Sequence, residues 1–181
     1  MSYHSNVESA NAPALAEHRL RIGRLPSMDI ASHMEKVSRM DAVHRRLDRR
    51  ADFELWYWMA LDAGNQAVNA ALHACDITAE EPELASQVND IYLRQAETGS
   101  WSRVVKRGAD IIHPQMCEFE KPIPPRLGEA MDALARLEHY RDPCIRLGLE
   151  VSDEIIETCE SAYDQVLTIA RELVVGAGHE P

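Results

Sequence analysis

Two arginines on either side of a proline are the clearest candidates for chemistry in this sequence. Arg141 and Arg146 begin and end the run RDPCIR, residues 141–146. A guanidinium group donates paired hydrogen bonds to phosphates and carboxylates, so two of them that converge across a proline-broken turn form an anion site. Nearby acidic residues such as Asp142 and Glu138 could instead pair with them and only fix the turn. We predict Arg141, Asp142 and Arg146 as ligand-binding residues, and the structural alternative stays open.

Arg39 and His44 form a second arrangement with chemical potential. Histidine exchanges a proton near neutral pH, whereas arginine stays protonated and stabilises negative charge. The same spacing also arises by chance on a basic helix face, which is the simpler interpretation. We therefore assign no catalytic residue, and Arg39 with His44 is the alternative pair.

Histidine and cysteine residues show no spacing that is typical of a metal site. The closest pairs are His113 with Cys117 and His73 with Cys75. Zinc needs three or four convergent ligands, and Pro114 breaks the helix that would align the first pair. The repeated Glu-x-x-His pattern of di-iron bundles is also missing. The sequence predicts no metal and no cofactor.

These residues must be positioned by helices, because apolar side chains recur at helical spacing through most of the chain. The expected helices cover residues 28–49, 52–75, 78–99, 125–140 and 152–175, with a short helical turn at 102–110. Four prolines make residues 113–125 a surface connection, and no strand pattern competes. Amphipathic helices joined by short links bury their apolar stripes together. The sequence predicts an all-α fold, an antiparallel up-down helical bundle of four main helices plus an inserted helix at 78–99.

Length and composition predict one domain, since 181 residues with 45% hydrophobic content can bury a sizeable core. We divide the chain into a partly ordered N-terminal arm at 1–26, a helical bundle at 27–176 and a tail at 177–181. The net charge of −11 disfavours general nucleic-acid binding by the surface, and only residues 44–50 form a basic run. No apolar run long enough for a membrane span is present, so we expect a soluble, cytoplasmic protein without membrane contact.

Consecutive aromatic residues at Trp56, Tyr57 and Trp58 point in different directions around the second predicted helix. One part of this block faces the core, and another part must be covered by something else. We predict that Trp56, Tyr57 and Trp58 form the interface of a homodimer. The alternative is that the N-terminal arm folds over them.

Three stretches, in this order, resemble the HEPN family of helical bundles. They are residues 66–74 (QAVNAALHA), His113 followed by residues 123–125 (IPP), and residues 140–143 (YRDP). Members of this family often occur beside nucleotidyltransferases and in toxin–antitoxin and RNA-processing systems. The resemblance implies a helical bundle that dimerises and that has RNA, a nucleotide, a nucleotidyltransferase or another protein as its partner.

The resemblance fails at the residue that matters most for catalysis. Ribonuclease members carry an Arg-x4-6-His motif near the start of the last helix. If Arg141 is the arginine of this motif, Arg146 stands where the histidine is expected, and no histidine follows before His179. Arginine cannot take a proton from a ribose hydroxyl at any working pH.

The sequence therefore predicts a non-catalytic HEPN-like binding or regulatory module that meets a phosphate-bearing ligand or a protein partner. One alternative is a toxin–antitoxin ribonuclease whose altered site joins Arg39, His44, Arg141 and Arg146 across a dimer. Another is a helical protein that binds a small molecule, because the alanine-rich second helix could border a pocket.

Overall fold

The protein is mostly helical, with a small sheet beside the helices. The computed structural model describes residues 28–79, 90–95, 97–107 and 110–180, so the predicted arm at 1–26 lies outside these residues. The helices are α2 (Ile30–His44), α3 (Phe53–Ala74), α4 (Pro125–Glu138) and α5 (Asp153–Gly176), and the strands are β1 (Asp90–Gln95), β2 (Trp101–Arg107) and β3 (Cys117–Phe119). Two short turns of helix, η1 (Pro114–Met116) and η2 (Arg141–Arg146), complete the described elements. None of the described helices combines the length and apolar character of a membrane span.

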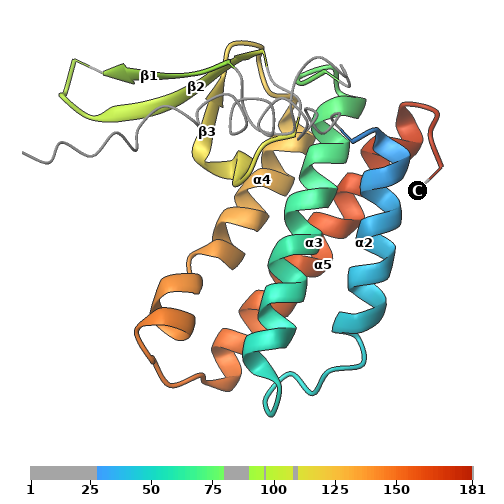
Figure 1. Ribbon diagram of the computed structural model, residues 1–181, viewed down its shortest axis with the longest axis vertical. Helices are drawn as coiled ribbons and strands as arrows, with labels where there is room; N and C mark the ends of the chain where they lie inside the picture. The colour runs from blue at the N-terminus through green and yellow to red at the C-terminus, as the bar shows by residue number, and fades with distance from the viewer. Residues whose placement is uncertain (1–27, 80–89, 96, 108–109, 181) are drawn as a thin grey trace, which may run out of the picture.

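Helix α3 lies in the centre of the helical part and packs against α2, α4 and α5 (Figure 1). It has buried residues along its whole length, and many of them are alanines. At Gly64 an added Cβ would lie 2.9 Å from Cδ1 of Leu134, so this glycine allows α4 to approach closely. The small residues of α3 therefore let the neighbouring helices share one continuous core.

Side chains at the helix starts explain where α2 and α5 begin. Asp29 caps α2, with its Oδ1 accepting a hydrogen bond of 2.7 Å from the amide of Ser32. Ser152 caps α5 by accepting from the amide of Ile155 at 3.3 Å. Such caps satisfy amide groups that have no partner inside the helix.

The first helix is shorter than the sequence suggests, because α2 ends at His44 instead of continuing to residue 49. The carboxylate of Asp48 accepts hydrogen bonds from the amides of Arg50 and Ala51, at 2.9 and 2.7 Å. Asp52 accepts one from the amide of Asp48 at 3.0 Å. These aspartate turns offer the backbone an alternative to the helix, so the basic run forms the link to α3.

The sequence predicts an inserted helix at 78–99, and this prediction is wrong where the structure describes the C-terminal part, because residues 90–95 form strand β1. Residues 80–89 lie outside the described residues. The helical turn predicted at 102–110 is also wrong, because β2 pairs with β1 in antiparallel fashion. Gly99, with φ of 82°, lies in the connection between the two strands. Ile91, Val104 and Val105 are β-branched residues around this glycine, which is a hairpin signal that helical periodicity obscured.

The connection at 113–125 contains structure that its prolines did not reveal. It includes η1 and then β3, which pairs in parallel with β2 to complete the sheet order β1-β2-β3. The three strands lie toward one end of the helices (Figure 1). After α4, the predicted stop at residues 141–143 is one turn of π-helix, in which the amide of Leu147 bonds to the carbonyl of Asp142 at 3.0 Å. Pro143 cannot donate to a regular α-helical bond, and the wider turn bypasses it.

Candidate functional site

A pocket of about 750 Å³ lies where α2, α3, the segment 110–113 and η2 meet. Its size falls in the range that is usual for small-molecule sites. Most of its lining residues have polar or charged side chains, and the lining residues are Met28, His33, Lys36, Trp58, Asp62, Asn65, Gln66, Asn69, Asp110, Ile111, Ile112, His113, Arg141 and Arg146.

Arg141 and Arg146, which the sequence predicts to converge, both line this pocket. Both also contact the same carboxylate oxygen, Oδ1 of Asp142, at 3.2 Å each. Arg141 forms a further ion pair with Glu138 and is largely buried, whereas the side chain of Arg146 is 60% exposed. Pairing with acidic neighbours and access to the pocket therefore coexist, and Arg146 has the more accessible charge.

A histidine reaches Arg141 from a distant part of the chain. Nη1 of Arg141 lies 3.4 Å from Nε2 of His113, and Nδ1 of His113 lies 3.7 Å from Oε1 of Glu138. Because arginine can only donate, Nε2 of His113 accepts and the ring proton is on Nδ1, facing the carboxylate. Burial raises the pKa of Glu138 above its ordinary value, although His113 and Arg141 oppose this shift.

Asn69 fixes the segment that carries His113. Its side chain is buried and makes two hydrogen bonds with Ile111, donating to the carbonyl at 2.9 Å and accepting from the amide at 2.7 Å. Two residues further on, His113 adopts a left-handed backbone conformation with φ of 56°. The hydrogen bonds from Asn69 and the left-handed backbone at His113 together place the His113 side chain beside Arg141.

Lys36 brings a further positive charge to the pocket from α2. Among the described residues it makes no ion pair within 4.0 Å, and it is only partly buried. Asp62 lies on the exposed part of the lining. The cationic side chains of the pocket therefore come from two segments about a hundred residues apart, around residue 36 and at 141–146.

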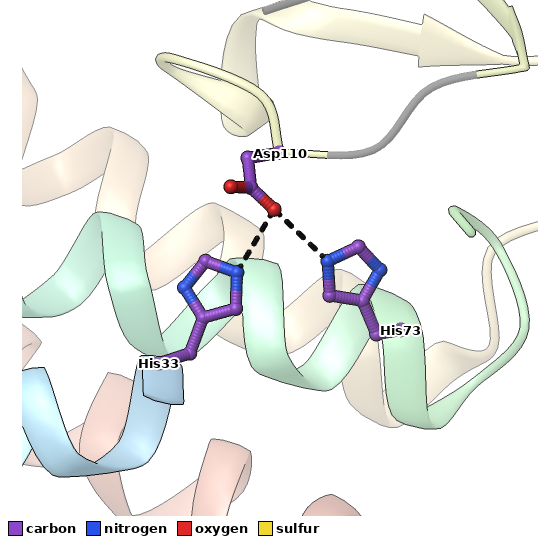
Figure 2. A group of neighbouring side chains, drawn as sticks. All are labelled: His33, His73 and Asp110. Atoms are coloured by element: carbon purple, nitrogen blue, oxygen red, sulfur yellow. Dashed lines mark hydrogen bonds and ion pairs between the residues drawn. The ribbon is translucent and has the colours of Figure 1, made fainter. Parts of the chain in front are cut away.

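Deeper in the molecule, two histidines share one carboxylate (Figure 2). Oδ1 of Asp110 lies 3.0 Å from Nε2 of His33 and 3.2 Å from Nε2 of His73. The other carboxylate oxygen accepts a hydrogen bond of 3.1 Å from the amide of Met28. Burial alone would raise the pKa of Asp110, but its hydrogen bonds to His33, His73 and Met28 outweigh this effect and hold the pKa well below its ordinary value.

The outer ring nitrogens of these histidines also have partners. Nδ1 of His33 lies 2.8 Å from Oε1 of Gln66, and Nδ1 of His73 lies 2.8 Å from Oγ1 of Thr78. The histidines themselves are buried, with side chains 1% and 0% exposed. Both rings are therefore held in a defined orientation.

Sequence reasoning missed this cluster, although it weighed His73 together with Cys75. The three residues come from α2, α3 and the segment before η1, so no local spacing joins them. One signal was present: Gln66, Asn69 and His73 recur at helical spacing on helix α3, most of whose residues are apolar. A polar stripe of this kind on a buried helix indicates partners elsewhere in the chain.

Arg39 and His44, the alternative catalytic pair, lie in different environments. Arg39 is exposed and pairs with Glu35 at 3.5 Å. His44 is buried at 4% exposure, with its ring centroid 4.8 Å from that of Trp56 and 4.5 Å from that of Tyr163. Neither nitrogen of His44 has a hydrogen-bond partner among the described residues, and neither Arg39 nor His44 lines the pocket.

The aromatic block divides between the core and the pocket. Trp56 and Tyr57 are 3% and 0% exposed, and the hydroxyl of Tyr57 donates to the carbonyl of Leu137 at 2.7 Å. Trp58 is half-buried and lines the pocket. Trp56 and Tyr57 therefore present almost no surface to a second copy of the chain, because the chain itself covers them.

The structure places a histidine beside Arg141, although the sequence has none at the histidine position of the Arg-x4-6-His pattern. Arg146 occupies that position in the sequence, while His113, 28 residues before Arg141, lies beside that arginine in space.

Comparisons with protein-family models, with curated proteins and with solved structures found no match for this chain.

Proposed function

We propose that this chain is a HEPN-like binding module whose pocket takes a phosphate-bearing ligand of about nucleotide size. The observation that carries this proposal is the convergence of Lys36, Arg141 and Arg146 on one pocket. Guanidinium and ammonium groups are the side chains that proteins use to bind phosphate. The exposed guanidinium of Arg146 and the ammonium of Lys36, which makes no ion pair within 4.0 Å among the described residues, are the two groups best placed to meet an incoming anion.

Other lining residues suit the remainder of a nucleotide. Trp58 offers an indole face, and an aromatic side chain of this kind stacks on any nucleobase. Asn65 and Gln66 add amide groups that can hydrogen-bond to a base or a sugar. Both the volume and the chemistry of the pocket therefore support a nucleotide better than inorganic phosphate alone.

Two features favour binding over catalysis. Arg141 is already engaged by Glu138 and Asp142. Nε2 of His113, the atom that would accept a proton as a general base, faces Arg141 at 3.4 Å. A base must be free to reach the proton that it removes, and this nitrogen is occupied.

Calorimetric titration with ADP and with pyrophosphate tests the proposal. We expect saturable binding that Arg146→Ala and Lys36→Ala each weaken by about ten- to hundredfold, since a charged hydrogen bond contributes about 1.5–3 kcal/mol. Arg49→Ala is the matched control, because Arg49 is an exposed arginine that pairs with Glu160 at 2.6 Å and does not line the pocket. Absence of binding by the wild type, or an equal loss in all three variants, contradicts the proposal.

The contact between Arg141 and His113 favours a second candidate, a ribonuclease with an altered site. It requires Arg141 to turn toward RNA and release Nε2 of His113 as a base. Incubation with mixed RNA should compare wild type with His113→Ala, Arg141→Ala and His44→Ala. A binding module leaves the RNA intact in all four samples, whereas cleavage lost only in the first two variants supports the nuclease.

We further propose the antiparallel up-down order of the helices and a homodimer, both of which the sequence predicts. The short link between α2 and α3 supports the helix order. Leu147 and Leu149, 80% and 50% exposed, offer apolar surface to a second copy in place of Trp56 and Tyr57. Light scattering of Leu147→Asp beside wild type tests this interface, and an unchanged dimeric mass argues against it. A nucleotidyltransferase partner and a toxin–antitoxin role rest on the sequence resemblance.

A further inference from the structure

The cluster of His33, His73 and Asp110 has the composition of a metal site. One nitrogen from each imidazole and one carboxylate oxygen lie within 4.8 Å of one another. They come from α2, α3 and the segment before η1, and Figure 2 shows both rings directed at the carboxylate. Two imidazoles with one carboxylate form a ligand set that suits divalent transition metals, whereas Mg²⁺ and Ca²⁺ prefer oxygen ligands alone.

Two of the three separations between ligand atoms fit an ion, and the two imidazole nitrogens lie within 4.8 Å of each other. Zinc lies about 2.0–2.2 Å from nitrogen and oxygen ligands, which separates neighbouring ligands by about 3.0–3.5 Å. The two nitrogen–oxygen separations are 3.0 and 3.2 Å. Oδ1 of Asp110 already lies at coordination spacing from both histidines.

The contacts of the two Nδ1 atoms, with Gln66 and Thr78, resemble those that orient metal-bound histidines in proteins. A metal-bound histidine donates its other N–H to an oxygen, which sets the tautomer and the ring orientation. Gln66 Oε1 can only accept, so Nδ1 of His33 carries a proton. The contact between Nε2 of His33 and the carboxylate is then favourable when either a metal ion or a second ring proton lies between the two atoms. Oγ1 of Thr78 can accept from Nδ1 of His73 in the same way.

We propose that His33, His73 and Asp110 bind one divalent transition-metal ion, such as Zn²⁺, through the two Nε2 atoms and the carboxylate. Three protein ligands leave at least one coordination position open, as in catalytic zinc sites. His33 and Asp110 both line the pocket, so the ion is reached from there. This proposal stands whether or not the pocket takes a phosphate-bearing ligand.

Without metal, a proton on His33 could hold the same network together. The two states differ in metal content and in spectrum. The full-length chain, produced without a histidine tag and stripped with chelator, should be titrated with Zn²⁺ by calorimetry and with Co²⁺ by visible absorption. We expect one equivalent of each ion to bind, and Co²⁺ to show ligand-field bands without a thiolate charge-transfer band.

Variants locate the ion. His73→Ala and Asp110→Asn should lose at least tenfold in Zn²⁺ affinity, while His139→Ala, the control at an exposed histidine outside the cluster, should keep it. Circular dichroism reports whether each variant is folded. If His73→Ala does not fold, Thr78→Val keeps all three ligands and removes only the outer partner of His73, and it should weaken Zn²⁺ binding by about tenfold.

Two results overturn the proposal. One is the absence of Co²⁺ binding by the wild-type protein when one equivalent of Co²⁺ is added. The other is a Zn²⁺ affinity that the substitutions at His73, Asp110 and Thr78 leave unchanged. In either case the cluster is a hydrogen-bonded clamp between α2, α3 and the segment before η1.

Discussion

Nη1 of Arg141 lies 3.4 Å from Nε2 of His113, although 28 residues separate them in the sequence. Glu138 completes the group, since it forms an ion pair with Arg141 and faces the other nitrogen of His113 at 3.7 Å. The three side chains belong to the end of α4, the start of η2 and the segment before η1. Glu138 therefore controls how much of the Arg141 charge is left for a ligand.

Glu138→Gln should strengthen the binding of pyrophosphate. The substitution keeps the shape of the side chain and removes the negative charge beside Arg141, so we expect an affinity roughly tenfold higher at low ionic strength, or about 1.4 kcal/mol. The raised pKa of Glu138 shows that folding disfavours its ionised form, so loss of this charge should leave the free energy of unfolding unchanged or slightly higher. Calorimetry and urea denaturation measure the two effects. Glu150→Gln, at an exposed position, is the control, and a weaker affinity in Glu138→Gln counts against the role given to Arg141.

His44 makes the stability of the protein depend on pH. Burial between Trp56 and Tyr163 lowers its pKa below the ordinary value of 6.5, with Asp41 opposing the shift. Below pH 6.5 the unfolded chain takes up a proton that folded His44 does not yet accept. The contribution of His44 is thus fully present above pH 6.5 and is lost as the pH falls toward the folded pKa, by at most about 1.4 kcal/mol per pH unit.

His44→Phe should remove this dependence. In the part of the chain that the structure describes, neither ring nitrogen of His44 has a hydrogen-bond partner, so an apolar ring also avoids the cost of burying unpaired polar atoms. We expect the variant to be about 1 kcal/mol more stable at pH 7, with a larger advantage at pH 5. Urea denaturation at both pH values measures this, and a variant that loses as much stability as wild type on acidification shows that His44 is not responsible.

Two glycine substitutions should have opposite effects. In a helix, alanine is more favourable than glycine by up to about 1 kcal/mol. At Gly128 an added Cβ meets only Ile123, at 3.9 Å, so Gly128→Ala should be more stable by up to that amount. At Gly64 the added Cβ lies 2.9 Å from the fully buried Leu134, and overpacking costs about 1–3 kcal/mol. Gly64→Ala should therefore be less stable than wild type in thermal denaturation, and a gain in stability would show that α4 can move away from α3 at no cost.

Trp56 and Trp58 are adjacent but should respond differently to alanine. Trp56 is almost completely buried, and truncation of such a side chain costs about 3–5 kcal/mol of folding free energy. Trp58 is half-buried on the pocket wall, so Trp58→Ala should cost less stability and instead weaken the binding of ADP. Denaturation curves and ADP titrations separate the two. A stable Trp56→Ala variant that changes only its oligomeric mass would restore Trp56 to the dimer interface.

The sequence alone determined the helices that have strong apolar periodicity and clear ends. Helices α3, α4 and α5 begin and end within a few residues of the predicted positions, because apolar spacing, Ser152 and the proline at residue 125 act on their immediate neighbours. It also placed Arg141 and Arg146 on one turn, because five residues across a proline leave little freedom. Their shared contact with Asp142 is local.

Only the tertiary structure decided the sheet and the side-chain clusters. Ile91 fits a helical stripe as well as a strand, and pairing with β2 selects the strand. His33, His73 and Asp110 meet because the segment before η1 crosses α2 and α3, where Asn69 clamps its backbone. The same crossing brings His113 to Arg141. Local patterns reach only a few residues along the chain, whereas these contacts join residues 28 to 77 positions apart through the path of the backbone between them.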